Sequence, residues 1–195
     1  MLFLKKNLLV LLFFLFKILV KLKFSYLASF FIYLNIRKLH NLKKNNKNII
    51  ILEKSHGIED IRIAYKNNKE NLNLFVLPRK IFNIIYVSIF KNRAKDLRDN
   101  FYLIKDKDLE KKQKTLINFL DQILIDLNKF IKISAFISFN YKYYAERELH
   151  KSCKKNNIKF IACHKECNVF DGELDYYKKI LLNIDKFQGD LITVY

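Results

Sequence analysis

Short apolar runs recur along the chain after residue 48, each four to seven residues long. Their nearly continuous Ile, Leu, Val and Phe content is typical of strands that are buried on both faces of a parallel sheet. The second run stops at Pro78, which cannot donate to a ladder of hydrogen bonds. The predicted strands are residues 49–52 (IIIL), 72–77 (LNLFVL), 101–104 (FYLI), 133–139 (ISAFISF), 158–162 (IKFIA) and 191–195 (LITVY).

Segments with the apolar periodicity of a helix lie between these runs. The periodicity is clearest at residues 109–130, where apolar residues recur at three- and four-residue steps. Helices are also predicted at residues 58–66, 144–156 and 174–187, and residues 81–91 are apolar enough for a helix or a strand. Strands that alternate with helices predict an α/β fold, a Rossmann-like three-layer domain with a mostly parallel sheet at residues 49–195.

Residues 1–40 are the most apolar part of the chain, and a polar linker at residues 41–48 separates them from the predicted domain. Lysines interrupt the apolar stretch before it reaches the about 20 residues that a spanning helix needs. We expect a helix that lies in a membrane interface; the alternatives are a helix packed on the domain and a cleaved signal peptide. On a helical wheel the lysines fall within about 160°: Lys5, Lys6, Lys17, Lys21 and Lys23.

The net charge of +18 is carried by lysine far more than by arginine, and the lysines accompany asparagine and isoleucine runs. This combination is typical of an AT-rich genome, so the charge alone is a weak functional signal. Proteins that bind nucleic acid favour the planar guanidinium of arginine, and the 11 tyrosines follow no module signature. We therefore expect no nucleic-acid partner, whereas an anionic membrane surface would attract the same lysines.

Cofactor and metal chemistry find little support in the sequence. With only 3 glycines, the chain has neither the dinucleotide-binding motif G-x-G-x-x-G nor a P-loop, so no cofactor is expected. Cys153, Cys163 and Cys167 are an odd number, which fits a reduced, cytosolic set. A zinc site there would need Cys163 and the adjacent His164 as ligands, and a thiol nucleophile would need them on one face of a strand. We expect no metal site.

A D-x-D motif, Asp106-Lys107-Asp108, follows the predicted strand at residues 101–104. It resembles the pair of carboxylates that holds a metal and a sugar diphosphate in one fold type of glycosyltransferase. We prefer the alternative that Asp108 caps a helix that begins at Leu109, because carboxylate oxygens accept the free N–H groups of a first helical turn.

Polar residues follow three of the predicted parallel strands. Ligands of open α/β sheets bind beyond the carboxyl ends of the strands, so these loops are the candidates for a site. They contain Ser55-His56-Gly57, Asn140-Tyr141 and His164-Lys165-Glu166.

The stretch ISAFISFNYKYYAERELHKSCKKNNIKFIACHKEC and the closing GDLITVY have a more specific order of residues than these short motifs. The order resembles bacterial surface-carbohydrate biosynthesis proteins (capsule or lipopolysaccharide) of the GT-B glycosyltransferase type. In those proteins a strand ends in an Asn-aromatic loop, a helix begins with Tyr-Tyr and acidic residues, and the next strand ends in His-Lys-Glu. The matching residues are Asn140, Tyr143, Tyr144, Glu146, Glu148, His164, Lys165 and Glu166.

The resemblance implies a transferase that uses a nucleotide sugar and a lipid-linked or glycan acceptor. Such a protein would lie on the cytoplasmic side of the inner membrane, peripherally or through an N-terminal anchor. Glu166 or His164 would be the catalytic base, because sugar transfer needs a base near the acceptor hydroxyl. Substrate binding would fall to His56, Gly57, Asn140, Tyr144, Glu146 and Lys165, with Lys165 facing phosphate.

A GT-B enzyme has a second Rossmann domain, which carries most of the nucleotide-sugar contacts. The resemblance therefore implies the acceptor-side half alone, which would need a second Rossmann-domain chain for activity. The alternative is a non-enzymatic, membrane-associated interaction module.

Overall fold

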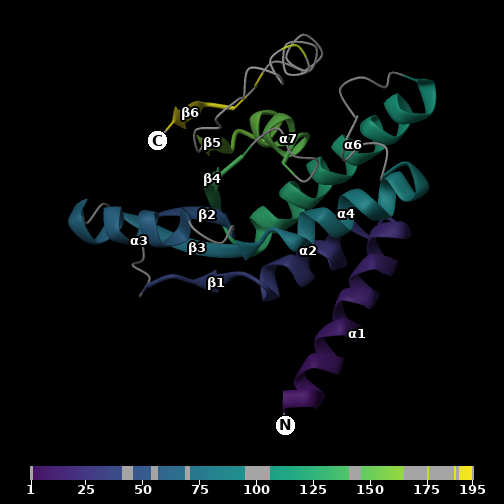
Figure 1. Cartoon of the computed structure of the whole chain (residues 1–195), viewed down its shortest axis with the longest axis horizontal. Coiled ribbons are helices and arrows are strands. Elements are labelled where there is room, and N and C mark those ends of the chain that lie inside the picture. Colours follow the sequence, from purple (N-terminus) through teal and green to yellow (C-terminus); the bar gives the residue numbers. More distant parts are fainter. Residues whose placement is uncertain are drawn as a thin grey trace.

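The chain folds into an α/β structure with a six-stranded, mostly parallel sheet and helices on both sides of it (Figure 1). This computed structural model describes residues 2–40, 46–53, 57–68, 71–94, 106–140, 146–164, 175, 187 and 189–194. The expected α/β class with a mostly parallel sheet is confirmed.

The sheet has the strand order β1-β3-β2-β4-β5-β6. Five strands are parallel, and the short β1 at one edge pairs antiparallel with β3. The chain runs from the central β2 outward to β3 and then returns to β4 on the other side of β2, so the strand order reverses between β2 and β4. The strands are β1 (Arg37–Lys38), β2 (Lys47–Glu53), β3 (Leu72–Pro78), β4 (Ile133–Ser138), β5 (Lys159–His164) and β6 (Leu191–Val194).

Side chains of the strands alternate between two apolar clusters, one on each face of the sheet. Ile49 and Ile51 pack with Ile61 of α3 (Gly57–Asn68) on one face. On the other face, Ile50 and Leu52 belong to the larger cluster. The helices on that face include α4 (Lys80–Phe90), α6 (Lys107–Phe130) and α7 (Leu149–Lys155), and α4 is followed by the 3-10 turn η1 (Lys91–Arg93).

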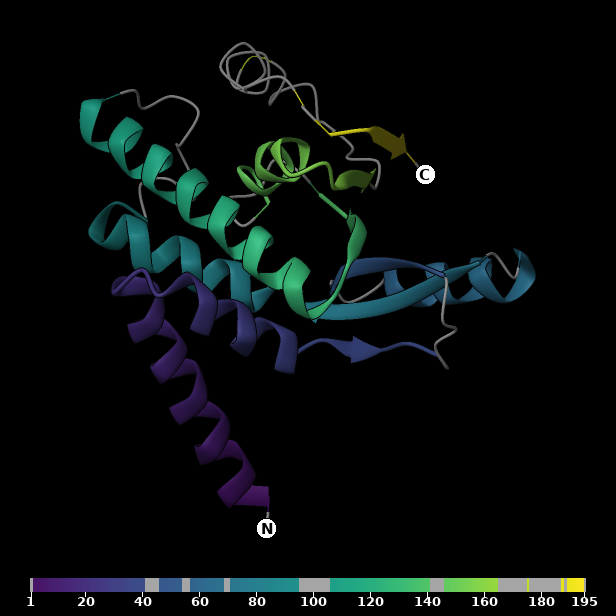
Figure 2. The same ribbon diagram turned by 180° about the vertical axis from the view of Figure 1, so that it is seen from behind.

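Two helices, α1 (Leu2–Lys21) and α2 (Ser25–Leu34), make up most of the N-terminal segment. Phe16 of α1 is fully buried and stacks on Phe31 of α2 with ring centroids 4.5 Å apart. The Ser29 hydroxyl of α2 donates to the carbonyl of Ile123 in α6 at 3.0 Å. The carboxyl end of α1 therefore belongs to the core, whereas its amino end points away from the sheet (Figure 2).

A helix break at Lys23 separates α1 from α2. Lys23 has a φ of 59°, its N–H donates to Val20 and the N–H of Phe24 donates to Leu19. This pair of bonds is a Schellman motif with lysine at the position that glycine usually occupies. The prediction that all five lysines lie on one helix is therefore wrong for Lys23, which lies in the break between α1 and α2. None of the described helices has both the length and the apolar composition that crossing a bilayer requires.

The described elements otherwise match the predicted ones in type, and residues 81–91 resolve as the helix α4. The edge strand β1 was not predicted. The helix predicted at residues 144–156 begins only at Leu149, because residues 146–148 form a turn that is bonded to α6 and to Arg79, the residue after β3. The strand predicted at residues 101–104 and most of the helix predicted at residues 174–187 lie outside the described residues.

Candidate functional site

The strands β2, β4 and β5 end at Glu53, Ser138 and His164, so the three candidate loops do leave the same edge of the sheet. Because β2, β4 and β5 are neighbours, this edge includes the point where the strand order reverses, which is where open α/β sheets bind ligands. Of the candidate residues, the structure describes Gly57, Asn140, Glu146 and the backbone of His164. His56, Tyr144, Lys165 and Glu166 lie outside the described residues.

Gly57 opens helix α3 in close contact with the ring of Phe139. A Cβ at Gly57 would lie 1.9 Å from Cε1 of that ring, far inside the van der Waals distance. Phe139 is buried and belongs to the apolar cluster beneath α3. The absence of a side chain at residue 57 therefore allows the segment after β2 to approach the segment after β4.

Asn140 is buried directly after β4 and Phe139. Its backbone is fixed from within the loop, since the Ser138 hydroxyl donates to the Asn140 carbonyl at 2.8 Å and the Asn140 N–H donates to the same hydroxyl oxygen at 3.4 Å. This small turn ends the strand and sets the direction in which the chain leaves the sheet.

Glu146 is almost fully buried and forms a two-pronged ion pair with Arg79. The Arg79 Nη2 donates to Oε2 at 2.9 Å, and Nε donates to Oε1. Arg79 follows β3, and Glu146 lies in the segment after β4, so the pair joins two strand ends that flank β2. Glu146 was predicted as a substrate-binding residue; both of its carboxylate oxygens bond to Arg79.

Glu148, two residues further on, is also buried. It accepts a hydrogen bond from Gln113 of α6 at 2.7 Å, and Lys151 lies 3.1 Å from its second oxygen. These bonds tie the turn before α7 to the long helix α6. Glu146 and Glu148, which the sequence places near the start of a predicted helix, are thus buried anchors of the carboxyl edge.

His164 is the last residue of β5 and pairs with Val194 of β6. Its neighbour Cys163 is half-buried, whereas Cys153 of α7 is fully buried and burial raises the pKa of its thiol well above the ordinary range. In the part of the chain that the structure describes, no three His, Cys, Asp or Glu side chains come together as metal ligands.

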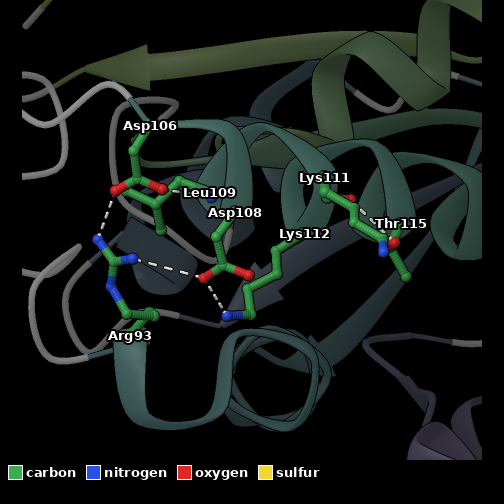
Figure 3. A network of polar contacts seen from close by, with 7 residues as sticks. All are labelled: Arg93, Asp106, Asp108, Leu109, Lys111, Lys112 and Thr115. Atoms are coloured by element: carbon green, nitrogen blue, oxygen red, sulfur yellow. Dashed lines mark hydrogen bonds and ion pairs between the residues drawn. The ribbon is translucent and has the colours of Figure 1, made fainter.

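The D-x-D motif forms a helix cap and an ion-pair cluster (Figure 3). The Asp106 carboxylate accepts the N–H of Leu109 at 2.9 Å, so Asp106, not Asp108, is the N-cap and the helix begins at Lys107. Arg93 lies between the two carboxylates, 2.7 Å from Asp106 and 3.4 Å from Asp108, and Lys112 bonds to Asp108. The hydrogen bonds from Arg93 and Leu109 lower the pKa of Asp106.

Arg79 and Arg93 are the residues that sequence reasoning missed at this side of the protein. Arg79 binds a carboxylate 67 positions away in sequence, and Arg93 binds two that are 13 and 15 positions away. The planar fork of a guanidinium suits such contacts better than an ammonium group does. The sequence does contain an indication of both residues, because arginine is sparse in a chain whose cations are mostly lysine.

Comparisons with models of known protein families, with curated proteins and with solved structures gave no match to this chain.

Proposed function

We propose that the chain is a Rossmann-like, acceptor-side domain of a glycosyltransferase-like protein of surface-polysaccharide biosynthesis. It binds a lipid-linked or glycan acceptor at the carboxyl edge of the sheet and works with a second Rossmann-domain chain that holds the nucleotide sugar. In this proposal the protein lies at the membrane surface on the cytoplasmic side of the inner membrane.

One observation carries this proposal: residues of three separate candidate loops leave the sheet at the carboxyl ends of the adjacent strands β2, β4 and β5. The reversal of strand order between β2 and β4 lies within this set. In open α/β sheets such a reversal is the usual position of a ligand.

The candidate residues have four different roles. His164 and Glu166 are the candidate bases for an acceptor hydroxyl, and Lys165 is the candidate partner for a phosphate leaving group. Asn140, His56 and Tyr144 supply hydrogen-bonding groups for sugar hydroxyls. Glu146 acts indirectly, since its ion pair with Arg79 sets the shape of the edge.

A non-enzymatic interaction module is the second candidate, and two contacts favour it. The Phe139 ring fills the space beside Gly57, and the Glu146 carboxylate is bonded to Arg79. In both contacts, the protein's own side chains fill space at the carboxyl edge of the sheet.

Acceptor binding and a glycan phenotype in the host distinguish the two candidates. The proposal predicts that the double variant His164→Ala with Glu166→Ala weakens binding of a lipid-linked sugar acceptor and alters the host's surface glycan. Lys159→Ala, at the opposite end of the same strand β5, is the matched control and leaves both unchanged. An unchanged glycan and unchanged binding in the double variant would favour the interaction module.

A further inference from the structure

Exposed apolar side chains cover much of the outer faces of α1 and α2. The side chains of Phe14, Ile18, Leu22, Phe24, Leu27 and Leu34 are between 37% and 64% exposed, and we call them the α1–α2 apolar surface. Helix α2 contains no charged residue, so its exposed side lacks the polar face that helices on the surface of a water-soluble domain carry. Leu22 and Phe24 flank the break at Lys23, so the surface continues from one helix to the next.

The charge carried by residues 1–40 themselves has one sign. Residues 1–40 contain no Asp or Glu, and all 19 acidic residues of the chain lie at Glu53 or beyond it. Lys17, Lys21 and Lys23 are exposed and, among the described residues, none of them has an ion-pair partner. A bias towards lysine codons explains the large number of lysines, but it does not explain why residues 1–40 contain no Asp or Glu.

A cavity of about 290 Å³ lies directly beside the apolar surface, between the end of α1, the end of α4 and helix α6. Its lining includes Lys21, Lys23 and Lys91, together with the hydroxyl residues Ser88 and Thr115. The Ser88 hydroxyl is buried and has no hydrogen-bond partner within the described ranges. Three ammonium groups and an unpartnered hydroxyl are the donors that a phosphate group accepts from.

We propose that the α1–α2 apolar surface docks on an anionic phospholipid bilayer and that the adjacent lysine-lined cavity holds the phosphate of a lipid headgroup. The apolar side chains enter the boundary between headgroups and acyl chains, and the lysines remain at the level of the phosphates. The cavity opens between α1, α4 and α6, on the face of the sheet opposite α3. This inference deepens the membrane location given in the proposed function, and it does not rest on the proposed sugar transfer.

A second copy of the chain is the competing occupant of this surface. A twofold interface would bring the same patch of both copies together, so the lysines that border the patch would be concentrated at one interface. No acidic residue within residues 1–40 is available to offset the repulsion among them. A bilayer with anionic lipids supplies the missing charge together with the apolar phase.

Vesicle flotation of the full chain tests the charge part of the proposal. We expect the chain to float with phosphatidylglycerol-containing vesicles and much less with pure phosphatidylcholine vesicles, with a decrease as salt is raised. Lys21→Gln and Lys91→Gln should each weaken binding about fivefold. Lys66→Gln in α3, on the opposite face of the sheet, is the matched control and should leave binding unchanged.

Tryptophan fluorescence tests the apolar part, because the chain contains no tryptophan. A single Leu27→Trp substitution should shift its emission to the blue when anionic vesicles are added and should be quenched by brominated lipids. Ile63→Trp in α3 is the matched control, since Ile63 is 55% exposed and lies away from the proposed surface. Its emission should not move.

Three results would overturn the proposal. One is equal flotation with anionic and neutral vesicles. Another is a blue shift of equal size at residues 27 and 63. The third is a stable dimer in solution that Leu27→Glu dissociates while vesicle binding of the same variant stays unchanged.

Discussion

Arg79 and the buried Glu146 form an ion pair that joins the end of β3 to the segment after β4, across the end of the central strand β2. Each partner comes from a loop at the carboxyl edge, and the two residues are 67 positions apart in sequence. The pair therefore holds the edge of the sheet in one shape, on which the candidate site depends.

Removal of one partner should destabilise the fold strongly. Glu146→Ala leaves the guanidinium of Arg79 without its carboxylate in a mostly buried place, and we expect a loss of about 3 kcal/mol in the free energy of unfolding. Replacing both residues by methionine should cost less than the single change, because no unpaired charge remains. Urea unfolding measures both values. A loss near zero for Glu146→Ala would instead indicate a carboxylate that is free to bind substrate.

The contact between Gly57 and Phe139 predicts a second stability effect. Gly57→Ala forces the Phe139 ring out of its place, and this overpacking should cost about 1–3 kcal/mol. Phe139→Leu alone should also destabilise, but combined with Gly57→Ala it should recover part of the loss. If the two effects simply add, the two residues do not share the space that the structure assigns to them.

The cap at Asp106 predicts a pH dependence. Asp106→Ala should lower the Tm by about 2–4 °C at neutral pH, and Asp108→Ala should lower it less, because an exposed ion pair contributes less than a cap. The pKa of Asp106 is lowered in the folded protein, so its contribution is present above the carboxyl's ordinary value of 3.8 and is lost as the pH falls through the folded pKa. The Tm difference should therefore shrink below about pH 4. A thermal shift on addition of Mn²⁺ that Asp106→Ala abolishes would contradict the cap interpretation.

Thiol labelling should separate the cysteines. Cys153 is fully buried and its pKa is raised, so it should react with a maleimide at pH 7 only when the protein unfolds. Cys163 is half-buried and should react faster. Mass spectrometry of a Cys167→Ser variant after brief labelling measures both rates. Rapid modification of Cys153 in the native protein would show that α7 does not pack on α6 and β5 as described.

The strands were predictable because their short, nearly continuous apolar runs are typical of buried strands. Ile49 to Leu52 is apolar at every position, which fits a strand with side chains in two cores, and β2 does supply both apolar clusters. The start of α6 was misplaced by two residues, since Asp106 and Asp108 have equal capping ability and only the position of Arg93 and the bond to Leu109 distinguish them.

The break between α1 and α2 was not predictable from composition. Lys23 adopts a left-handed conformation that usually indicates glycine or asparagine, and packing of Phe16 and Phe31 across the break compensates for it. The turn at residues 146–148 was missed for a similar reason. Its glutamates fit the predicted helix at residues 144–156, and only their tertiary partners Arg79 and Gln113 reveal that they are buried.

Residue-resolved NMR of the full chain in detergent, titrated with a short-chain lipid-linked sugar acceptor, tests the central claim most directly. The account predicts saturable shifts at the amides of Gly57, Asn140 and His164, which follow or end β2, β4 and β5 at the carboxyl edge. Amides at the opposite edge, such as those of Asn48 and Lys159, should stay in place. Shifts confined to α1 and α2, or none that saturate, would contradict a sugar site at this edge.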